Sequence, residues 1–220
     1  VGGESTRPGA KPVSVRDELA RVVPVIEGIR AELPDVCISV DTRRAEVARQ
    51  ALENGADMVN DVSSMSDPGM LDVVVEHECP VCLMHMQGLP ENMQDDPQYD
   101  DVVDEVRSYL DKATSRLIEE GVLPSRIVVD PGIGFGKKLG DNLTLLSSGR
   151  EIVPDSRMGL MWGVSRKSMF RDLLGRERSD DRLAGSLGVA ARSVQKEVDI
   201  VRVHDGTEHS DTFAAMKAVR

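Results

Sequence analysis

Polar side chains gather at the points where short apolar runs of this 220-residue sequence end. The six points are Asp41-Thr42, Asn60-Asp61, His85-Met86-Gln87, Asp130-Pro131-Gly132, Ser165-Arg166-Lys167 and Arg202-Val203-His204-Asp205. A single run that ends in Asp or Asn is usually explained by a helix N-cap. All six end in polar or ionisable residues, with Arg and Lys among them, and this pattern indicates a shared site.

The side chains at these points offer two kinds of chemistry. Carboxylate and amide groups, which suit the N–H edge of a guanidine-like heterocycle, come from Asp41, Asn60 and Asp130. Cations suited to phosphate come from Lys167, Arg202 and His204. A loop punctuated by glycine and proline, residues 2–9, adds a hydroxyl and a guanidinium ahead of the first helix.

Runs rich in β-branched residues alternate with segments of helical spacing, which predicts βαβ units and a parallel sheet. Strands are predicted at 36–41, 58–62, 81–85, 126–130, 159–164 and 200–204, and helical spacing is clear over 19–33, 47–52, 102–117 and 183–194. Pro24 should kink or split the first helix. The carboxyl ends of parallel strands are the natural ligand face, so we expect the polar ends to meet there.

Composition limits the classes of function. The chain is 40% hydrophobic and 30% charged, with a net charge of -11, and we expect one domain over residues 1–220. The acidic balance argues against nucleic acid and membrane partners, and no apolar run could cross a bilayer. Only seven of the 27 basic residues are Lys, which would suit a high-salt host. No secretory leader is visible, and three cysteines in such a chain predict reduced thiols and a cytoplasmic protein.

Other candidate features favour structural roles. The pair Cys79 and Cys82 lacks a second Cys/His pair that would complete a zinc site. The glycines at 132, 134 and 136 do not match a dinucleotide or P-loop spacing, so we expect a mobile loop with one exposed aromatic, Phe135.

The remaining histidines, the tyrosines and the polar segment after residue 90 are expected to have structural or surface roles. We expect surface positions for His77 and His209, a packed or loop-orienting role for His85, and packing for Tyr99 and Tyr109. Residues 91–101 should form a solvated loop or helix start, in which Met93 need not touch a ligand.

Seven motifs, in one order along the chain, resemble dihydropteroate synthase. They are GGESTRPGA at 2–10, SVDT at 39–42, NDVS at 60–63, LMHMQG at 83–88, DPGIGFGK at 130–137, GVSRKS at 163–168 and RVHD at 202–205. The resemblance implies a parallel (β/α)8 TIM-type barrel. It also implies condensation of 6-hydroxymethyl-7,8-dihydropterin diphosphate with 4-aminobenzoate, which gives dihydropteroate and pyrophosphate.

The resemblance also implies a role for each matching residue. The pterin would be held by Asp41, Asn60, Asp130 and Lys167, with Met84 and Gly163 lining its slot. The diphosphate would be bound by Arg202 and His204, assisted by Thr6. The aminobenzoate subsite would be shaped by Arg7, Pro8, Phe135 and Ser165. The aminobenzoate carboxylate would lie near the helix start after Ser165, which is a favourable place for an anion.

The chemistry implied is dissociative, with C–O cleavage before the amine attacks. Asp41 and Asp130 would offset the positive charge of the pterin cation, while Mg²⁺, Arg202, Lys167 and His204 would complete the catalytic set. The family Asn that helps to hold the metal belongs to an N-terminal loop absent here, so no metal ligand is predicted in this chain. We therefore expect an N-terminally truncated barrel of about six full strands plus a remnant. By analogy with the family, the last helices would form a homodimer.

Two other functions remain open at this stage. A pterin-binding methyltransferase would share the pterin-gripping Asp and Asn, although it has no use for Ser165-Arg166-Lys167 or Thr6-Arg7-Pro8. A non-catalytic fragment or partner domain of a larger folate enzyme would fit the missing strands.

Overall fold

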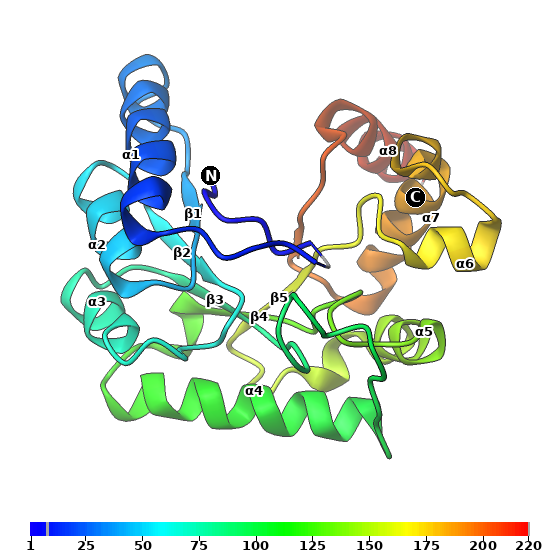
Figure 1. The fold of residues 1–220 in the computed structure, drawn as a ribbon. Helices are drawn as coiled ribbons and strands as arrows, with labels where there is room; N and C mark the ends of the chain where they lie inside the picture. Colours follow the sequence, from blue (N-terminus) through cyan, green and yellow to red (C-terminus); the bar gives the residue numbers. More distant parts are fainter. Residues whose placement is uncertain (8, 220) are drawn as a thin grey trace.

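A curled parallel sheet forms the centre of the molecule. The computed structural model describes residues 1–7 and 9–219, and its six strands pair in the order β1-β2-β3-β4-β5-β6, all parallel. The sheet curls into part of a (β/α) barrel, as predicted (Figure 1). The strands are β1 (Ser39–Asp41), β2 (Met58–Asp61), β3 (Val81–Met84), β4 (Ile127–Asp130), β5 (Gly159–Trp162) and β6 (Ile200–Val201).

The pairing register brings several candidate residues to one face of the sheet. Asp41 pairs with Asn60, Asn60 with Cys82, and Met84 with Asp130. Paired residues point to the same face, and so do residues two apart along a strand. These five side chains therefore all point into the concave interior of the sheet.

The alternate residues of the same strands point outward to the helices. Fully buried members of this outer layer are Val40, Val59, Leu83, Val129, Leu160 and Trp162. They pack against apolar stripes of the helices, such as Val106, Leu110 and Leu117 of α4. This main core holds the strands in place, and thereby fixes the positions of the polar residues at their ends.

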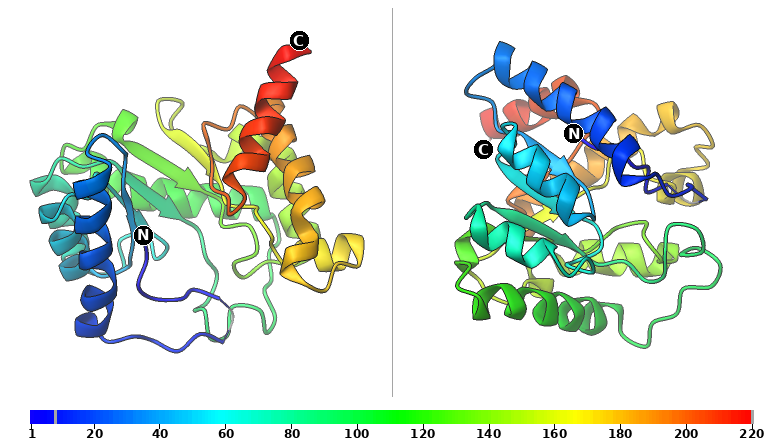
Figure 2. Two further views of the ribbon diagram at one scale, coloured as in Figure 1. Left: turned by 90° about the horizontal axis from the view of Figure 1, so that it is seen from above. Right: turned by 60° about the vertical axis from the view of Figure 1, so that its left-hand side comes forward.

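Helices follow the strands in alternation and cover the outer face (Figures 1 and 2). The α-helices are α1 (Val15–Glu32), α2 (Ala45–Glu53), α3 (Met70–Glu76), α4 (Val102–Glu119), α5 (Leu139–Ser148), α6 (Met169–Leu174), α7 (Leu183–Ser193) and α8 (Gly206–Ala218). Short 3₁₀ turns are η1 (Pro124–Arg126), η2 (Gly149–Ile152), η3 (Ser179–Arg182) and η4 (Val194–Lys196). None of the helices within 1–7 and 9–219 is long and apolar enough to cross a membrane.

The structure corrects some predicted boundaries. The helix predicted at 19–33 is α1, and it continues through Pro24, which lies on its exposed side, without being split. Strands β1, β5 and β6 are shorter than predicted, because the residues that flank them belong to loops, some of which line the site. The predicted helical segments 47–52, 102–117 and 183–194 correspond to α2, α4 and α7.

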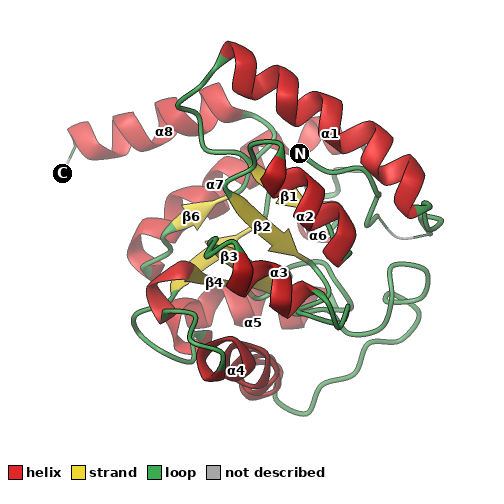
Figure 3. Cartoon of the chain, turned by 90° about the vertical axis from the view of Figure 1, so that its left-hand side faces the viewer, coloured by secondary structure: helices red, strands yellow, loops and turns green. Residues whose placement is uncertain are grey.

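The first residues of the chain run beside β1. The Val1 amino group donates to the Ser39 carbonyl oxygen at 2.7 Å, and the Asp41 amide donates to the Val1 carbonyl oxygen at 2.7 Å. Gly2 forms an isolated parallel bridge with Asp41. This pairing matches the predicted strand remnant, and it leads the following loop to the carboxyl ends of the strands (Figure 3).

Candidate functional site

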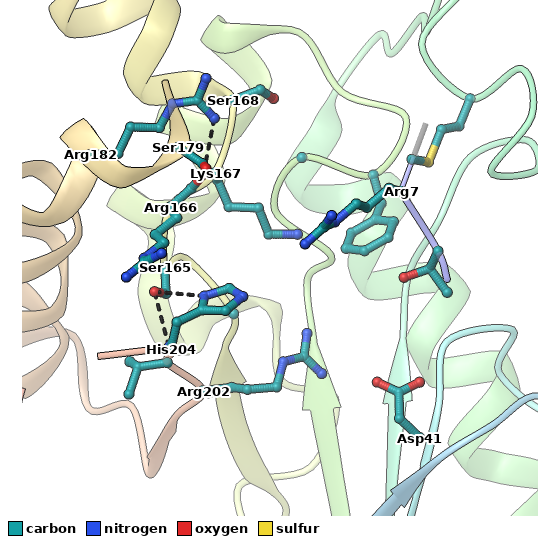
Figure 4. A pocket seen from close by; sticks show the side chains of 16 residues that line it. Arg7, Asp41, Ser165, Arg166, Lys167, Ser168, Ser179, Arg182, Arg202 and His204 are labelled. Carbon is teal, nitrogen blue, oxygen red and sulfur yellow. Dashed lines mark hydrogen bonds between the residues drawn. The ribbon is translucent and has the colours of Figure 1, made fainter. Parts of the chain in front are cut away.

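A cleft of about 590 Å³ opens at the carboxyl ends of the strands. Figure 4 shows it between the end of β1 on one side and the segments after β5 and β6 on the other. Its lining is formed by Thr6, Arg7, Asp41, Met93, Gly134, Phe135, Gly163, Ser165, Arg166, Lys167, Ser168, Ser179, Arg182, Arg202, Val203 and His204. The lining carries five Lys or Arg side chains and one carboxylate, so the cleft is rich in positive charge although the protein as a whole is acidic.

Most residues predicted for the site line this cleft. They are Thr6, Arg7, Asp41, Phe135, Gly163, Ser165, Lys167, Arg202 and His204. Asn60, Met84 and Asp130 are buried and lie below the lining, where Asn60 and Asp130 contact Arg202. Pro8 lies outside the described residues.

Arg202 connects the cleft to the polar residues of the strands. Its Nη1 donates to Asn60 Oδ1 at 3.2 Å and its Nη2 to Asp130 Oδ2 at 3.3 Å. A Cβ atom at Gly163 would lie 2.6 Å from Arg202 Nη2, so a side chain at residue 163 would displace the guanidinium from this position. Asn60 Nδ2 has no hydrogen-bond partner within the described chain, which leaves a buried donor beside this floor.

Burial shifts the protonation equilibria of two groups in the cleft. It raises the pKa of Asp41, and the charge of Arg202 opposes that rise. It lowers the pKa of Lys167 to about 8, against the attraction of Asp130 and Asp41. The Lys167 ammonium also lies 3.9 Å from the centroid of the Phe135 ring, within the range of a cation–π contact.

The loop after β5 turns sharply at Arg166, which has a positive φ of 56°. The Arg166 guanidinium pairs with both carboxylate oxygens of Asp205 and reaches Asp180 Oδ1 at 2.9 Å. Ser165 Oγ accepts a hydrogen bond from the His204 amide at 3.2 Å and lies 3.0 Å from His204 Nδ1 (Figure 4). These contacts join the end of β5 to the end of β6, and they hold Ser165 and His204 together at the cleft.

The N-terminal loop is anchored by two glutamates. Glu4 accepts hydrogen bonds from Arg43 Nε at 2.7 Å and from Arg44 Nη2 at 3.0 Å. Glu18 of α1, which is fully buried, accepts from Thr42 Oγ1 at 2.7 Å and forms an ion pair with Arg44. Arg44 thus links the loop, α1 and the start of α2.

Several structural interpretations need correction. Phe135 is buried, 7% exposed, instead of standing out from its loop. It packs with Val62, Met84 and Met93, so apolar burial explains why an aromatic residue stands in this glycine-rich loop. His209 is also buried, and its Nδ1 lies 2.7 Å from the Asp205 carbonyl oxygen at the start of α8.

The structural roles of the tyrosines and cysteines agree with prediction. Tyr99 and Tyr109 pack against the core, and both rings lie beside His85. Cys79 and Cys82 are buried free thiols, and burial raises the pKa of Cys79 to about 11. Such thiols are poor nucleophiles and metal ligands.

Three lining residues lie outside both the predicted site residues and the seven motifs, namely Met93, Ser179 and Arg182. Met93 is the only large apolar side chain between residues 90 and 99, and this isolation in a polar stretch was the available signal. Ser179 and Arg182 belong to η3, far from any strand end, and no spacing pattern marked them.

The described residues do not form a metal centre. No group of three or more His, Cys, Asp or Glu side chains within 1–7 and 9–219 is arranged to hold an ion. The cleft carboxylates Asp41 and Asp130 instead face the Arg202 guanidinium. The predicted Mg²⁺ therefore has no protein cage among these residues.

Comparison with known proteins identifies close relatives. A model of a family described as pterin binding enzyme matches residues 1–204. A dihydropteroate synthase of Escherichia coli is 46% identical over 219 residues, covering 100% of this chain and 76% of the relative. A Xanthomonas albilineans dihydropteroate synthase solved with 4-aminobenzoic acid is 41% identical, with a TM-score of 0.92 over 99% of this chain and 77% of that chain. A Burkholderia cenocepacia dihydropteroate synthase complexed with 7,8-dihydropteroate is 42% identical, with a TM-score of 0.91 over 99% and 79% of the two chains.

Proposed function

Because the chain belongs to the dihydropteroate synthase family of pterin-binding enzymes, we propose that its cleft condenses 6-hydroxymethyl-7,8-dihydropterin diphosphate with 4-aminobenzoate. The observation that carries this proposal is the pairing of two chemistries in one cleft. A cationic rim with Lys167 and Arg202, together with the His204 imidazole, lies directly above the buried Asn60 and Asp130. A heterocycle that bears a diphosphate needs both.

We assign the pterin to the floor of the cleft. Asp41, Asn60 and Asp130 offer acceptors and a buried donor for the pyrimidine edge, and Lys167 offers an ammonium. Met84 and Gly163 would bound the flat ring, since glycine leaves room that any side chain would fill. The Burkholderia cenocepacia relative, solved with dihydropteroate, supports binding of a pterin product by this fold.

We assign the diphosphate and the aminobenzoate to the two ends of the rim. Arg202 and His204, with the Thr6 hydroxyl, would hold the diphosphate. Arg7, Phe135 and Ser165 would bound the aminobenzoate, with Pro8 as a further candidate from the same loop. The Xanthomonas albilineans relative, solved with 4-aminobenzoic acid, supports this second subsite.

The proposed reaction breaks one bond and forms one bond. The C–O bond between the pterin methylene and the diphosphate breaks, and the electron pair leaves with pyrophosphate. The Asp41 and Asp130 carboxylates offset the positive charge left on the pterin, while Arg202 and His204 stabilise the leaving group. The free electron pair of the aminobenzoate amine then forms the C–N bond, and the amine releases one proton to solvent.

Mg²⁺ remains an expectation taken from the resemblance. Mg²⁺ is usually held by one or two carboxylates together with substrate phosphates, so the diphosphate itself would supply most of its ligands. The described residues contain no group of three or more His, Cys, Asp or Glu side chains that could hold the ion, so the protein would supply at most one or two ligands. A dependence of diphosphate affinity on added Mg²⁺ tests this expectation.

We further propose a cytoplasmic homodimer that uses the last helices. His209 is the only buried residue within α8, and Val219 beyond it is 86% exposed, so α8 has surface available for a partner. Light scattering should give a mass of twice the 24.0 kDa of one chain. A mass of one chain at micromolar concentration would contradict this proposal.

Calorimetric titration with the pterin diphosphate tests the proposed function. We expect micromolar binding by the wild-type chain, and a loss of about 10- to 150-fold in Asp130→Asn, because hydrogen bonds to charged groups contribute about 1.5–3 kcal/mol. Asp104→Asn, an exposed carboxylate of α4, is the matched control and should bind within about twofold of wild type.

Turnover with 4-aminobenzoate then separates the alternatives. A chain that binds the pterin diphosphate and forms dihydropteroate has the proposed activity. Binding without turnover would favour a non-catalytic pterin-binding domain. A folded chain with no binding would reject the assignment of the floor. No observation within the described cleft favours the methyltransferase alternative over the condensation.

A further inference from the structure

Lys137 is a buried cation that the proposed chemistry does not use. It follows Phe135 and Gly136 in the loop after β4, and it is only 3% exposed. Its Nζ donates to the carbonyl oxygens of Gly132 at 3.1 Å and of Phe135 at 3.0 Å, and it lies 2.8 Å from His85 Nδ1. The His85 carbonyl oxygen lies at 3.4 Å as a fourth acceptor, so the three donors of the ammonium all have partners.

The acceptors around Lys137 carry no formal charge. None of the ion pairs within the described residues includes Lys137, so the burial of its charge is offset by carbonyl dipoles and by the imidazole. Burial lowers the pKa of Lys137 to about 7; the charges of Asp130 and Asp141 favour its ammonium form, and that of Lys167 opposes it. Burial and Lys137 lower the pKa of His85 to about 3, so His85 is neutral and its Nδ1 can accept.

The loop around Lys137 can follow this path only with glycine at two positions. A Cβ atom at Gly132, with φ of 68°, would lie 1.8 Å from the His85 carbonyl oxygen. One at Gly136, with φ of 60°, would lie 2.3 Å from the carbonyl oxygen of Gln87. The loop therefore packs closely against the segment after β3, and the buried Lys137 side chain contacts both segments.

The contacts of Lys137 also bear on the position of Phe135. Its carbonyl oxygen is held by Lys137, and its ring meets the Lys167 ammonium at the wall of the cleft. Neighbouring contacts hold the loop from its outer side, because Tyr99 donates to the Gly136 carbonyl oxygen at 2.6 Å and Asn142 accepts from the Gly134 amide at 2.7 Å.

We propose that Lys137 is a positioning residue, which with neutral His85 fixes the loop over residues 131–137 so that Phe135 forms the aminobenzoate side of the cleft. The inference rests on the proposed function, because it assigns Phe135 to that subsite. The strands hold most of the pterin floor, since Asn60 and Asp130 belong to β2 and β4. The loop also touches this floor, where the Gly132 amide donates to Asp130 Oδ1 at 2.8 Å and Phe135 packs on Met84 and Lys167. Loss of Lys137 should thus affect one substrate more than the other.

Steady-state kinetics of Lys137→Met test this selectivity. We expect the KM for 4-aminobenzoate to rise at least tenfold, while the Kd of the pterin diphosphate, measured by calorimetry, stays within about threefold of wild type. Lys138→Met is the matched control, because Lys138 is the next residue and its side chain is 54% exposed; both constants should stay within about twofold. Unchanged constants in a folded Lys137→Met variant, or equal losses for both ligands, would overturn the proposal.

Hydrogen exchange gives a reading that does not depend on turnover. Amides of residues 134–136 should exchange faster in Lys137→Met than in wild type, and at the wild-type rate in Lys138→Met. If the wild-type chain binds the pterin diphosphate but forms no product, the proposed function fails. The role of Lys137 is then still decided by the hydrogen exchange of residues 134–136 and by the affinity for 4-aminobenzoate in the presence of the pterin diphosphate. Unchanged exchange would reject it.

Substitutions of His85 keep the proposal testable if Lys137→Met does not fold. His85→Asn places an acceptor close to the position of Nδ1 and should preserve the KM for 4-aminobenzoate within about threefold. His85→Leu removes the acceptor and should reproduce the selective rise expected for Lys137→Met. Equal behaviour of the two His85 variants would contradict a role for the Lys137–His85 contact.

Discussion

Lys167 shows how a single side chain can serve both packing and binding. Its ammonium lies over the Phe135 ring, and its pKa is lowered to about 8 by burial while Asp130 and Asp41 favour the charged form. A lysine in such surroundings is charged near neutral pH and loses its proton in mildly alkaline solution. Ligand binding that relies on this charge should therefore depend on pH.

The pH dependence of pterin diphosphate affinity tests this prediction. We expect constant affinity up to about pH 8 and a fall of about tenfold above it, because a charge-assisted hydrogen bond is roughly twice as strong as a neutral one. Lys167→Met should bind more weakly and without this step. The Lys138→Met variant, altered at an exposed lysine, should keep the step. A wild-type affinity that stays level to pH 10 would show that the Lys167 charge is not used.

The same shift has a defined sign for stability. Between about pH 8 and the ordinary lysine pKa, the unfolded chain binds more protons at residue 167 than the folded chain does. The contribution of Lys167 to the free energy of unfolding thus rises with pH across that window. Lys167→Met should remove this contribution in urea titrations at pH 7 and pH 10.

At the scale of elements, α1 holds the N-terminal loop through its buried Glu18. The Glu18 carboxylate pairs with Arg44, which also reaches Glu4 in the loop. We expect Glu18→Gln to lower the free energy of unfolding by about 3 kcal/mol, because removing one partner leaves the other buried charge uncompensated. Urea unfolding followed by Trp162 fluorescence measures the change.

Glu27→Gln provides the control on the same helix. Glu27 is exposed, so its substitution should change the free energy of unfolding by less than about 0.5 kcal/mol. If the two variants were equally stable, the buried ion pair would contribute nothing to anchoring the loop.

The elements that position the site were largely predictable from sequence, for a physical reason. Each strand is a short apolar run that ends in a polar residue, and parallel strands bring such ends to one edge. The positions of Asp41, Asn60 and Asp130 follow from that pattern alone, and the register confirms them. The seven motifs added the roles that we propose for these residues, which spacing could not supply.

Other features depend on contacts that no local pattern records. The burial of Phe135 requires Val62 and Met93, which come from separate loops. Arg182 reaches the cleft by way of η3, where it donates to the Arg166 carbonyl oxygen at 3.1 Å. The turn at Arg166 likewise depends on distant partners, Asp180 and Asp205. Each of these depends on tertiary packing and was therefore missed or misread.

At the scale of the whole molecule, the sheet and the cleft differ in the sequence separation of the residues that form their contacts. Each strand pairs with the strand next to it in sequence, so the sheet can be assembled step by step along the chain. The cleft instead needs both ends of the sheet, since Arg202 and Asn60 are 142 residues apart. The chain spans 76% of the length of the Escherichia coli relative, and the contacts of Arg202 with Asn60 and Asp130 lie within that part.

Because of this difference in sequence separation, we expect the sheet to form before the cleft during folding. Closing a long loop costs more entropy than pairing neighbours, so contacts of high sequence separation are slow to form. We expect Trp162 fluorescence, which reports β5 against its helices, to recover in refolding before affinity for the pterin diphosphate does. A double-jump experiment with brief unfolding keeps the prolines in their native isomers and removes that slow phase. Simultaneous recovery of both signals would mean that the cleft forms with the sheet. If the order holds, the newly folded chain passes through a stage that is already compact but still unable to bind, and substrate can speed its completion only after the two ends of the sheet have met.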